Sequence, residues 1–154
     1  MFSTLLAPSV RIERTFRAPP ERVFDAWLDP GLVTKWMAPG SITARAEIDA
    51  RIGGHYRVFH AIDGMSAGGF DARITDLDRP RCLAFDWGFW GPERDQGPKY
   101  DSRLTLTFAV IPAGTRLLLV HDKLDALAAA QPEAAESVEF GWQDVFNKLA
   151  LVIE

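Results

Sequence analysis

The stretch from Pro132 to Ile153, PEAAESVEFGWQDVFNKLALVI, decides the fold of this protein. Its apolar residues recur at alternating steps of four and three, and they are Val138, Trp142, Val145, Leu149 and Val152, with Phe146 and Ile153 beside them. The opposite side carries the polar residues Glu139, Gln143, Asp144, Asn147 and Lys148. This pattern predicts an amphipathic α-helix over 132–153 whose broad apolar face must be covered by other elements.

Gly141 stands inside this predicted helix, where a glycine costs about 1 kcal/mol relative to alanine. Such a residue indicates either a strand packed closely against the helix or a space kept free for a ligand. Close packing is the commoner explanation for an isolated helical glycine. Both explanations are kept open here, because they lead to different structures around Gly141.

Length and composition limit the classes of protein to consider. The 154 residues suffice for one domain with a substantial core, and we expect residues 1–154 to form a single domain. The net charge of −4 at pH 7 argues against a nucleic-acid partner, because phosphates require a basic face. No apolar run is long enough to span a bilayer.

Cysteine content and the start of the chain indicate a compartment. Cys82 is the one cysteine, so no internal disulfide can form and nothing points to an oxidising compartment. The segment from Met1 to Val10 lacks a basic n-region and a full apolar region, which makes it a poor signal peptide. We therefore expect a cytoplasmic protein. Whether it forms a homodimer is left open by these features.

Most of the remaining chain alternates apolar and polar residues with the period of two that is typical of half-buried strands. A first strand is predicted over 10–17, followed by two short helices that carry Trp27 and Trp36. Over residues 42–122 we predict an antiparallel meander that forms one sheet. The fold class is therefore α+β: a curved antiparallel β-sheet wrapped around a long C-terminal α-helix, with two short helices after the first strand.

A series of short motifs runs along the chain in a fixed order. They are Glu13-Arg14-Thr15-Phe16, Ala18-Pro19-Pro20, Val23-Phe24, Ala26-Trp27, Trp36 with Pro39, Asp49 with Ile52-Gly53-Gly54, Leu83 to Trp87, Thr115 with Leu117 and His121, and Gly141-Trp142. In order and spacing, these motifs resemble the Aha-type heat-shock ATPase activator homologues. That family belongs to the START-related, birch-pollen-allergen-like SRPBCC superfamily, and the resemblance runs from about Arg11 to Leu149.

The resemblance implies a START-like, AHSA-like ligand-binding domain with the helix-grip fold. In that fold a curved antiparallel sheet grasps a long C-terminal helix, and a ligand cavity lies between them. The resemblance does not imply one activity, because related domains bind lipids or other apolar molecules, act as cyclases or hydrolases, or contact a chaperone. The eukaryotic activators carry an additional N-terminal domain, for which this chain has no room.

A cavity is predicted between the sheet and the closing helix, because small residues stand among large aromatic ones on the inward faces. Flat rings, small residues and a few polar tips are typical of an apolar ligand pocket. The residues predicted to bind the ligand are Trp36, Ala44, Ala46, Tyr56, Val58, His60, Phe70, Ala72, Phe85, Trp87, Leu106, Leu119, His121, Gly141, Trp142, Val145 and Phe146.

His60 and His121 are predicted to face inward as the polar tips of this pocket. Two imidazoles in one pocket could shuttle protons, which makes His60, His121 and Tyr56 candidates for catalytic residues. The alternative is that each histidine hydrogen-bonds a nearby group, as buried polar groups normally do. No metal site and no cofactor is predicted, because His55 and His60 point to opposite faces and no second cysteine is present.

Two further features are interpreted as structural. Residues 64–68 have the G-x-S-x-G pattern of a hydrolase nucleophile elbow around Ser66. That motif needs a strand-to-helix turn, whereas here it lies in a predicted hairpin, so we interpret it as accidental. Arg14 is predicted on the same face as Ile12 and Phe16, where it either ties the first strand to the closing helix or holds a ligand carboxylate.

These observations lead to three hypotheses about function. The first is a cytoplasmic binding protein for a small, largely apolar molecule held between the sheet and the C-terminal helix, which requires an aromatic pocket. The second is a cofactor-free enzyme of the cyclase or isomerase type, which would bring His60 and His121 together in a wet pocket. The third is a chaperone-interaction module like the heat-shock ATPase activators, which would expose a large apolar patch. No feature of the sequence itself supports a chaperone contact.

Overall fold

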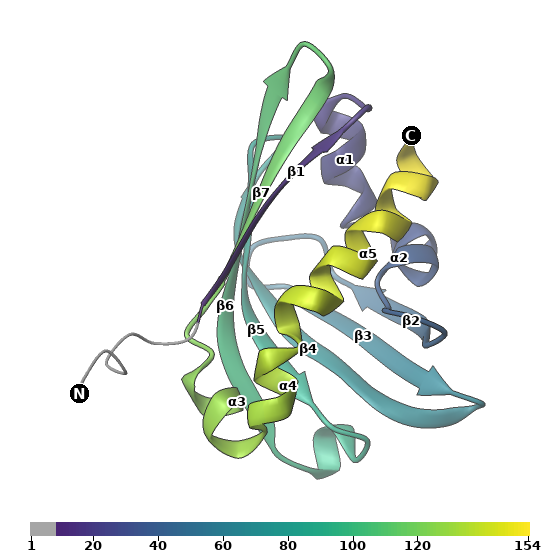
Figure 1. Cartoon of the computed structure of the whole chain (residues 1–154), viewed down its shortest axis with the longest axis vertical. Coiled ribbons are helices and arrows are strands. Elements are labelled where there is room, and N and C mark those ends of the chain that lie inside the picture. The colour runs from purple at the N-terminus through teal and green to yellow at the C-terminus, as the bar shows by residue number, and fades with distance from the viewer. Residues whose placement is uncertain (1–8) are drawn as a thin grey trace.

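The computed structural model of the protein describes residues 9–154 (Figure 1). The elements are, in order, β1 (Val10–Phe16), α1 (Pro20–Ala26), α2 (Pro30–Trp36), β2 (Thr43–Ile48), β3 (His55–Ile62), β4 (Met65–Asp78), β5 (Cys82–Trp90), a 3-10 turn η2 (Arg94–Gln96), β6 (Lys99–Ile111), β7 (Gly114–Asp122), α3 (Asp125–Ala130), α4 (Pro132–Glu136) and α5 (Val138–Ile153). The signal-peptide prediction for Met1 to Val10 falls, up to residue 8, outside the described residues.

Within residues 9–154, seven strands form one antiparallel sheet in the order β1-β7-β6-β5-β4-β3-β2. The strands from β2 to β7 pair with their neighbours in the chain, and β1 pairs with β7, where Ile12 lies opposite Leu119. The curved sheet wraps around α5, and α1 and α2 lie on the same side of it as this helix (Figure 1). The predicted α+β class, with two short helices after the first strand, is confirmed.

The C-terminal helix departs from the prediction at its start, because 132–153 is not one uninterrupted helix. It is divided at Ser137 into α4 and α5. The Ser137 hydroxyl donates to the carbonyl of Glu133 at 3.0 Å, and the Ser137 N–H is shared between the carbonyls of Glu133 and Ala134. A serine that bonds back to the preceding turn competes with the regular helical hydrogen bonds and bends the helix.

The apolar face of α5 packs on the concave side of the sheet, as predicted. Its residues Val138, Trp142, Val145, Phe146 and Leu149 are all buried. Aromatic rings from the two short helices complete this core. The Trp27 ring centroid lies 4.7 Å from that of Trp36 and 5.9 Å from that of Trp142. The first strand, the short helices and the closing helix are thus packed as one unit.

The sequence leaves two roles open for Arg14 on β1, a structural role and a ligand-binding role. The structure supports the structural role. Its Nη1 donates a hydrogen bond of 2.8 Å to Oδ1 of Asn147 on α5. Its guanidinium carbon also lies 5.8 Å from the centroid of the Phe16 ring. Arg14 therefore ties the first strand to the closing helix.

Candidate functional site

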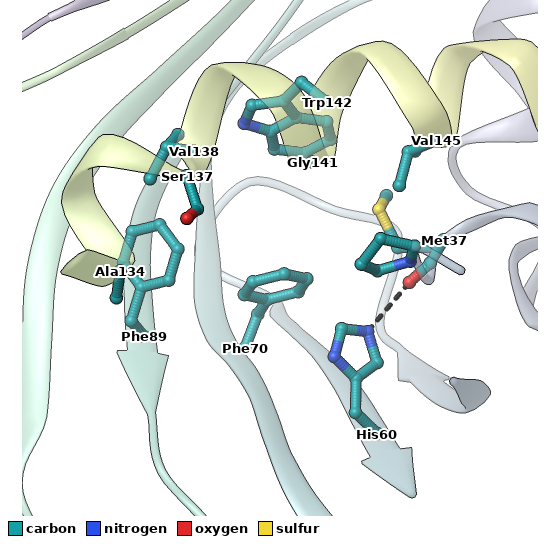
Figure 2. A pocket seen from close by; sticks show the side chains of 11 residues that line it. Met37, His60, Phe70, Phe89, Ala134, Ser137, Val138, Gly141, Trp142 and Val145 are labelled. Atoms are coloured by element: carbon teal, nitrogen blue, oxygen red, sulfur yellow. Dashed lines mark hydrogen bonds between the residues drawn. The ribbon is translucent and has the colours of Figure 1, made fainter. Parts of the chain in front are cut away.

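A cavity of about 200 Å³ lies between the first turns of α5, the strands β3 to β5 and the loop that follows α2 (Figure 2). It is lined by Met37, Pro39, His60, Phe70, Phe89, Ala134, Ser137, Val138, Gly141, Trp142 and Val145. Ala134 and Ser137 are exposed, whereas Trp142 and Val145 are buried. The mouth of the cavity is therefore at the junction of α4 and α5, where Ser137 bends the helix.

Gly141 borders open space rather than a closely packed strand. A Cβ atom built on Gly141 would have no heavy atom within 4 Å, outside its chain neighbours and its own helix backbone. The two explanations kept open for this glycine are thereby distinguished, because close packing would put a backbone or side chain against that position. A Cβ at 141 would instead meet open space at the border of the cavity, which Gly141 lines.

Aromatic rings form the walls of the cavity. Phe70 on β4 and Phe89 on β5 meet edge to face, with ring centroids 5.6 Å apart. Trp142 faces them from α5, and the His60 ring lies 5.0 Å from Phe70 in a perpendicular arrangement (Figure 2). A mostly apolar lining with few polar groups is the usual character of a small-molecule site.

His60 contributes a polar group to this lining and holds one wall in place. Its Nε2 lies 2.9 Å from the carbonyl oxygen of Met37 (Figure 2). Because a carbonyl only accepts, Nε2 must carry the proton, and Nδ1 of the neutral ring is an acceptor. Burial lowers the pKa of His60 below its ordinary value, the Met37 carbonyl partly opposes this, and the positive charges of Arg94 and Lys148 add to the lowering.

The loop after α2 is fastened to α5, which fixes the cavity wall that contains Met37 and Pro39. Lys148 donates to the carbonyl oxygens of Ala38 and Gly40. Asp144 accepts a hydrogen bond of 2.7 Å from the Gly40 N–H. These contacts use side chains from the polar side of the helix, so both faces of α5 contribute to the site.

His121 lies in a separate, internally satisfied network. The indole Nε1 of Trp142 donates to His121 Nδ1 at 3.1 Å, so in the neutral ring Nε2 carries the proton. That Nε2 donates to Ser102 Oγ at 2.8 Å, and Ser102 in turn donates to the Trp87 carbonyl. Burial lowers the pKa of His121 to about 3. His121 is therefore a neutral core residue with both nitrogens bonded, as the structural alternative for this histidine predicts.

The buried neutral state of His121 makes stability depend on pH. Unfolded chains take up a proton at His121 near its ordinary pKa of 6.5, whereas the folded protein resists until about pH 3. The free energy of unfolding is expected to fall as the pH is lowered through this window, by up to about 1.4 kcal/mol per pH unit from this residue. Urea unfolding at pH values from 7 to 5 gives the free energy of unfolding at each pH. This free energy should change less steeply with pH in His121→Asn than in the wild type or in a His55→Gln control. Equal slopes in all three proteins would contradict this account.

The predicted ligand-binding residues divide between the cavity and the packed core. Those that line the cavity are His60, Phe70, Gly141, Trp142 and Val145. Those that are fully packed in the core are Trp36, Tyr56, Val58, Ala72, Phe85, Trp87, Leu106, Leu119, His121 and Phe146. Ala44 and Ala46 are half-buried on β2 and pack against that core. The space on the sheet side therefore lies next to Phe70 and Phe89 rather than beside the alanines.

Tyr56 does not reach the cavity. Its hydroxyl donates to the Trp27 carbonyl inside the core, and burial raises the pKa of this hydroxyl. The three candidate acid–base groups are therefore not brought together. His60 lines the cavity, whereas Tyr56 and His121 are bonded elsewhere.

Other lining residues were not predicted from the sequence. They are Met37, Pro39, Phe89, Ala134, Ser137 and Val138. Phe89 could have been included, because it shares the inward face of its strand with Trp87 and Phe85. Met37 and Pro39 come from a loop, and Ala134 and Ser137 reach the mouth through the bend between α4 and α5, so periodicity gives no signal for them.

Ser66 lies at the start of β4, directly after the β3–β4 turn, and is followed by strand rather than helix. Its hydroxyl donates to the Pro92 carbonyl at 2.8 Å. Ser66→Ala is expected to leave ligand binding unchanged and to cost about 1 kcal/mol or less in stability, the usual net value of one hydrogen bond. A covalent adduct at Ser66 after treatment with an acyl-serine inhibitor would contradict the structural interpretation.

Within residues 9–154, the structure shows neither a metal-binding cluster nor a membrane-spanning helix. No group of three or more His, Cys, Asp or Glu side chains lies in an arrangement that could hold a metal ion. In the same described part of the chain, no helix combines the length and apolar content needed to cross a membrane.

A curved antiparallel sheet that grips a C-terminal helix, with a cavity between the two, defines the helix-grip class of the SRPBCC superfamily. The chain belongs to the family described as "Activator of Hsp90 ATPase homolog 1-like protein", which matches residues 17–154. No curated protein matches the chain.

Several solved structures share this architecture. A protein from Chromobacterium violaceum is 29% identical, with a TM-score of 0.79, over 96% of this chain and 98% of its own. The protein Ms6760 from Mycobacterium smegmatis is 26% identical, with a TM-score of 0.76, over 94% of this chain and 90% of its own. The AHSA1 protein from Silicibacter pomeroyi is 23% identical, with a TM-score of 0.69, over 93% of this chain and 95% of its own. At this identity the similarity concerns the fold alone.

Proposed function

We propose that this protein binds a small, largely apolar ligand in the cavity between the sheet and α5. The observation that carries the proposal is the open space beside Gly141, in a helix whose buried face is otherwise packed on the sheet. A volume of about 200 Å³ is below the roughly 300 to 1,000 Å³ of sites for drug-sized molecules. We therefore infer a ligand of one or two rings rather than a long chain.

The lining residues have distinct roles in this proposal. Phe70, Phe89 and Trp142 contact the flat faces or edges of the ligand, where aromatic pairs add to the gain from apolar burial. Gly141 provides the space that the ligand fills. His60 is the polar group that orients it. We extend the proposal to the whole chain, so that residues 1–154 act as one ligand-binding domain, supported by the family match over 17–154.

An acid–base enzyme is less well supported by the same geometry. Such a reaction would need two proton-transferring groups within reach of one ligand. His60 lines the cavity, but both nitrogens of His121 are engaged in the core. A binding protein needs only the orienting contact that His60 can make.

The family description favours one second candidate, a module that contacts a heat-shock ATPase through its outer surface. Phe140 and Leu151, which are 79% and 86% exposed on α5, are the surface to test. Stimulation of a purified Hsp90-type ATPase by the protein, lost in a Phe140→Ser, Leu151→Ser variant, would support this candidate. Absence of stimulation would leave ligand binding as the function.

Native mass spectrometry of the purified protein tests the principal proposal. We expect a population that carries a retained small molecule, and an increase in melting temperature when one- and two-ring apolar compounds are added. Ligand at one hundred times its Kd stabilises the folded state by about 2.7 kcal/mol. If no mass is retained and none of a panel of such compounds raises the melting temperature, the proposal is contradicted.

The compartment is also a proposal. We infer a cytoplasmic protein, because the single cysteine Cys82 is a free thiol and the core is built without disulfides. Fluorescence microscopy of a C-terminally tagged chain in the producing cell would test this, and a signal at the cell envelope would contradict it.

A further inference from the structure

We propose that the cavity selects a neutral ligand that carries a hydrogen-bond donor, a hydroxyl or an N–H group, and that His60 Nδ1 accepts this hydrogen bond. This inference rests on the proposed function and specifies the chemical class of the ligand. It follows from which polar atoms line the cavity and from the direction in which each of them already uses its proton.

The proton on His60 is fixed by the cavity wall. Nε2 donates to the Met37 carbonyl, so the neutral ring has its lone pair on Nδ1. Within residues 9–154, Nδ1 makes no hydrogen bond. The polar side-chain atoms that are buried without a partner there belong to other residues, namely Trp27, Thr75, Trp87, Trp90 and Asp122. We infer that Nδ1 is accessible from the cavity that His60 lines.

The other polar side-chain groups of the lining offer no free donor, because the Trp142 indole N–H already donates to His121 Nδ1. The Ser137 hydroxyl donates its hydrogen bond to the Glu133 carbonyl, which leaves lone pairs free on Oγ. The Met37 carbonyl can only accept. The free polar side-chain atoms of the lining, His60 Nδ1 and Ser137 Oγ, thus present lone pairs to the ligand, and a ligand that brings a donor satisfies them.

The same arrangement disfavours anions. A carboxylate in this cavity would face the lone pairs of His60 and Ser137 and lose its hydration without gaining a side-chain donor, which is unfavourable in an apolar site. The nearby cations are already engaged by backbone carbonyls. Lys148 on α5 binds Ala38 and Gly40, and Arg94 in the loop after β5 binds the carbonyls of His60 and Gly68.

Three probes of nearly the same shape test the inference at about pH 7: 2-naphthol, 2-methoxynaphthalene and 2-naphthoate. Isothermal titration calorimetry is expected to yield binding of 2-naphthol about five- to tenfold tighter than that of 2-methoxynaphthalene, the value of one net hydrogen bond. Binding of 2-naphthoate should be weaker still, by more than a further tenfold. Equal affinities for the naphthol and its methyl ether would overturn the inference.

Two variants of matched shape separate the acceptor from the packing of His60. His60→Asn keeps a polar atom near the position of Nδ1, whereas His60→Leu fills a similar volume without one. Both lose the Met37 contact, so a general disturbance of the wall would affect them alike. The preference for 2-naphthol over its ether should persist in His60→Asn and fall to within about twofold in His60→Leu. A preference that survives in His60→Leu would contradict the assignment of Nδ1.

Acidification supplies an independent readout on the unmodified protein. Protonation places a hydrogen on Nδ1 and turns it from acceptor into donor. Burial is the main reason that the pKa of His60 lies below 6.5, and the charged groups that act on this ring, Arg94 from the loop after β5 and Lys148 from α5, add to the lowering. The preference for 2-naphthol over its methyl ether should therefore be constant near neutral pH and decline only at pH values below 6.5. The affinity for 2-naphthoate should then rise relative to that for 2-naphthol. A preference that is retained once Nδ1 of His60 is protonated would overturn the inference.

The two proposals fail in distinguishable ways. If the three probes bind with equal affinity, the cavity is a ligand site without the selectivity proposed here. If neither naphthalene nor any of the three probes binds, the proposed function is contradicted and this inference falls with it.

Discussion

Trp142→Ala is expected to lower the free energy of unfolding by about 3–5 kcal/mol, the usual penalty for removing a buried aromatic side chain. Trp142 is 5% exposed, and its ring lies 5.8 Å from that of Trp87 and 5.9 Å from that of Trp27. The substitution leaves a cavity between the helix and the sheet. It also removes the indole N–H from His121 Nδ1, which leaves that buried acceptor unpaired.

Phe140→Ala is the matched control for this prediction. Phe140 lies on the same helix, two residues earlier, and its side chain is 79% exposed. Its removal should change stability by about 0.5 kcal/mol or less. Urea unfolding followed by circular dichroism measures both variants. Similar stabilities for the two would mean that α5 is not held against the sheet by Trp142.

Gly141→Leu is expected to abolish ligand binding, with a loss of affinity of about one hundredfold or more, while the fold survives. The leucine side chain enters space in which a Cβ meets no heavy atom within 4 Å, so it occupies the ligand's place without a backbone clash. Replacing a glycine within a helix should also stabilise the protein by about 0.5–1 kcal/mol. Lost affinity together with unchanged or raised stability is a combination that a misfolded variant cannot produce.

Two control variants accompany Gly141→Leu. Gln143→Leu adds the same side chain on the exposed side of α5 and should leave binding unchanged. Gly141→Ala adds one methyl group and should weaken binding less than leucine does. Calorimetric titration with 2-naphthol compares the variants. Normal binding by Gly141→Leu would contradict the location of the site.

The architecture followed from periodicity because each element has one face that must be buried. The stripe from Val138 to Leu149 on the closing helix and the alternation along the strands predict which side of each element faces inward. The bend at Ser137 was not predicted, because it depends on a side-chain hydrogen bond to Glu133 that is invisible to hydrophobic spacing. The structural role of Arg14 could be framed as one of two alternatives but not decided.

The site was harder to predict because alternation gives the face of a residue and not its depth in the core. Tyr56, Phe85 and Trp87 do face inward, but they pack on one another with ring centroids 4.8 to 5.9 Å apart. Gly141 was the informative residue, since a missing side chain on a buried helix face marks where volume remains. The loop residues Met37 and Pro39 line the cavity, and hydrogen bonds of Lys148, Asp144 and His60 with that loop hold it in place.

Titration of the ¹⁵N-labelled protein with 2-naphthol, followed by two-dimensional NMR, tests the central claim of a ligand cavity beside Gly141 most directly. The largest chemical-shift changes are predicted at the backbone N–H of Gly141 and at the N–H groups of Phe70 and Phe89, because an aromatic ligand beside them alters their local magnetic environment. The exposed Leu151, on the same helix, should remain unaffected. Saturating ligand without shifts at Gly141, or with its largest shifts on the outer surface of α5, would contradict the account.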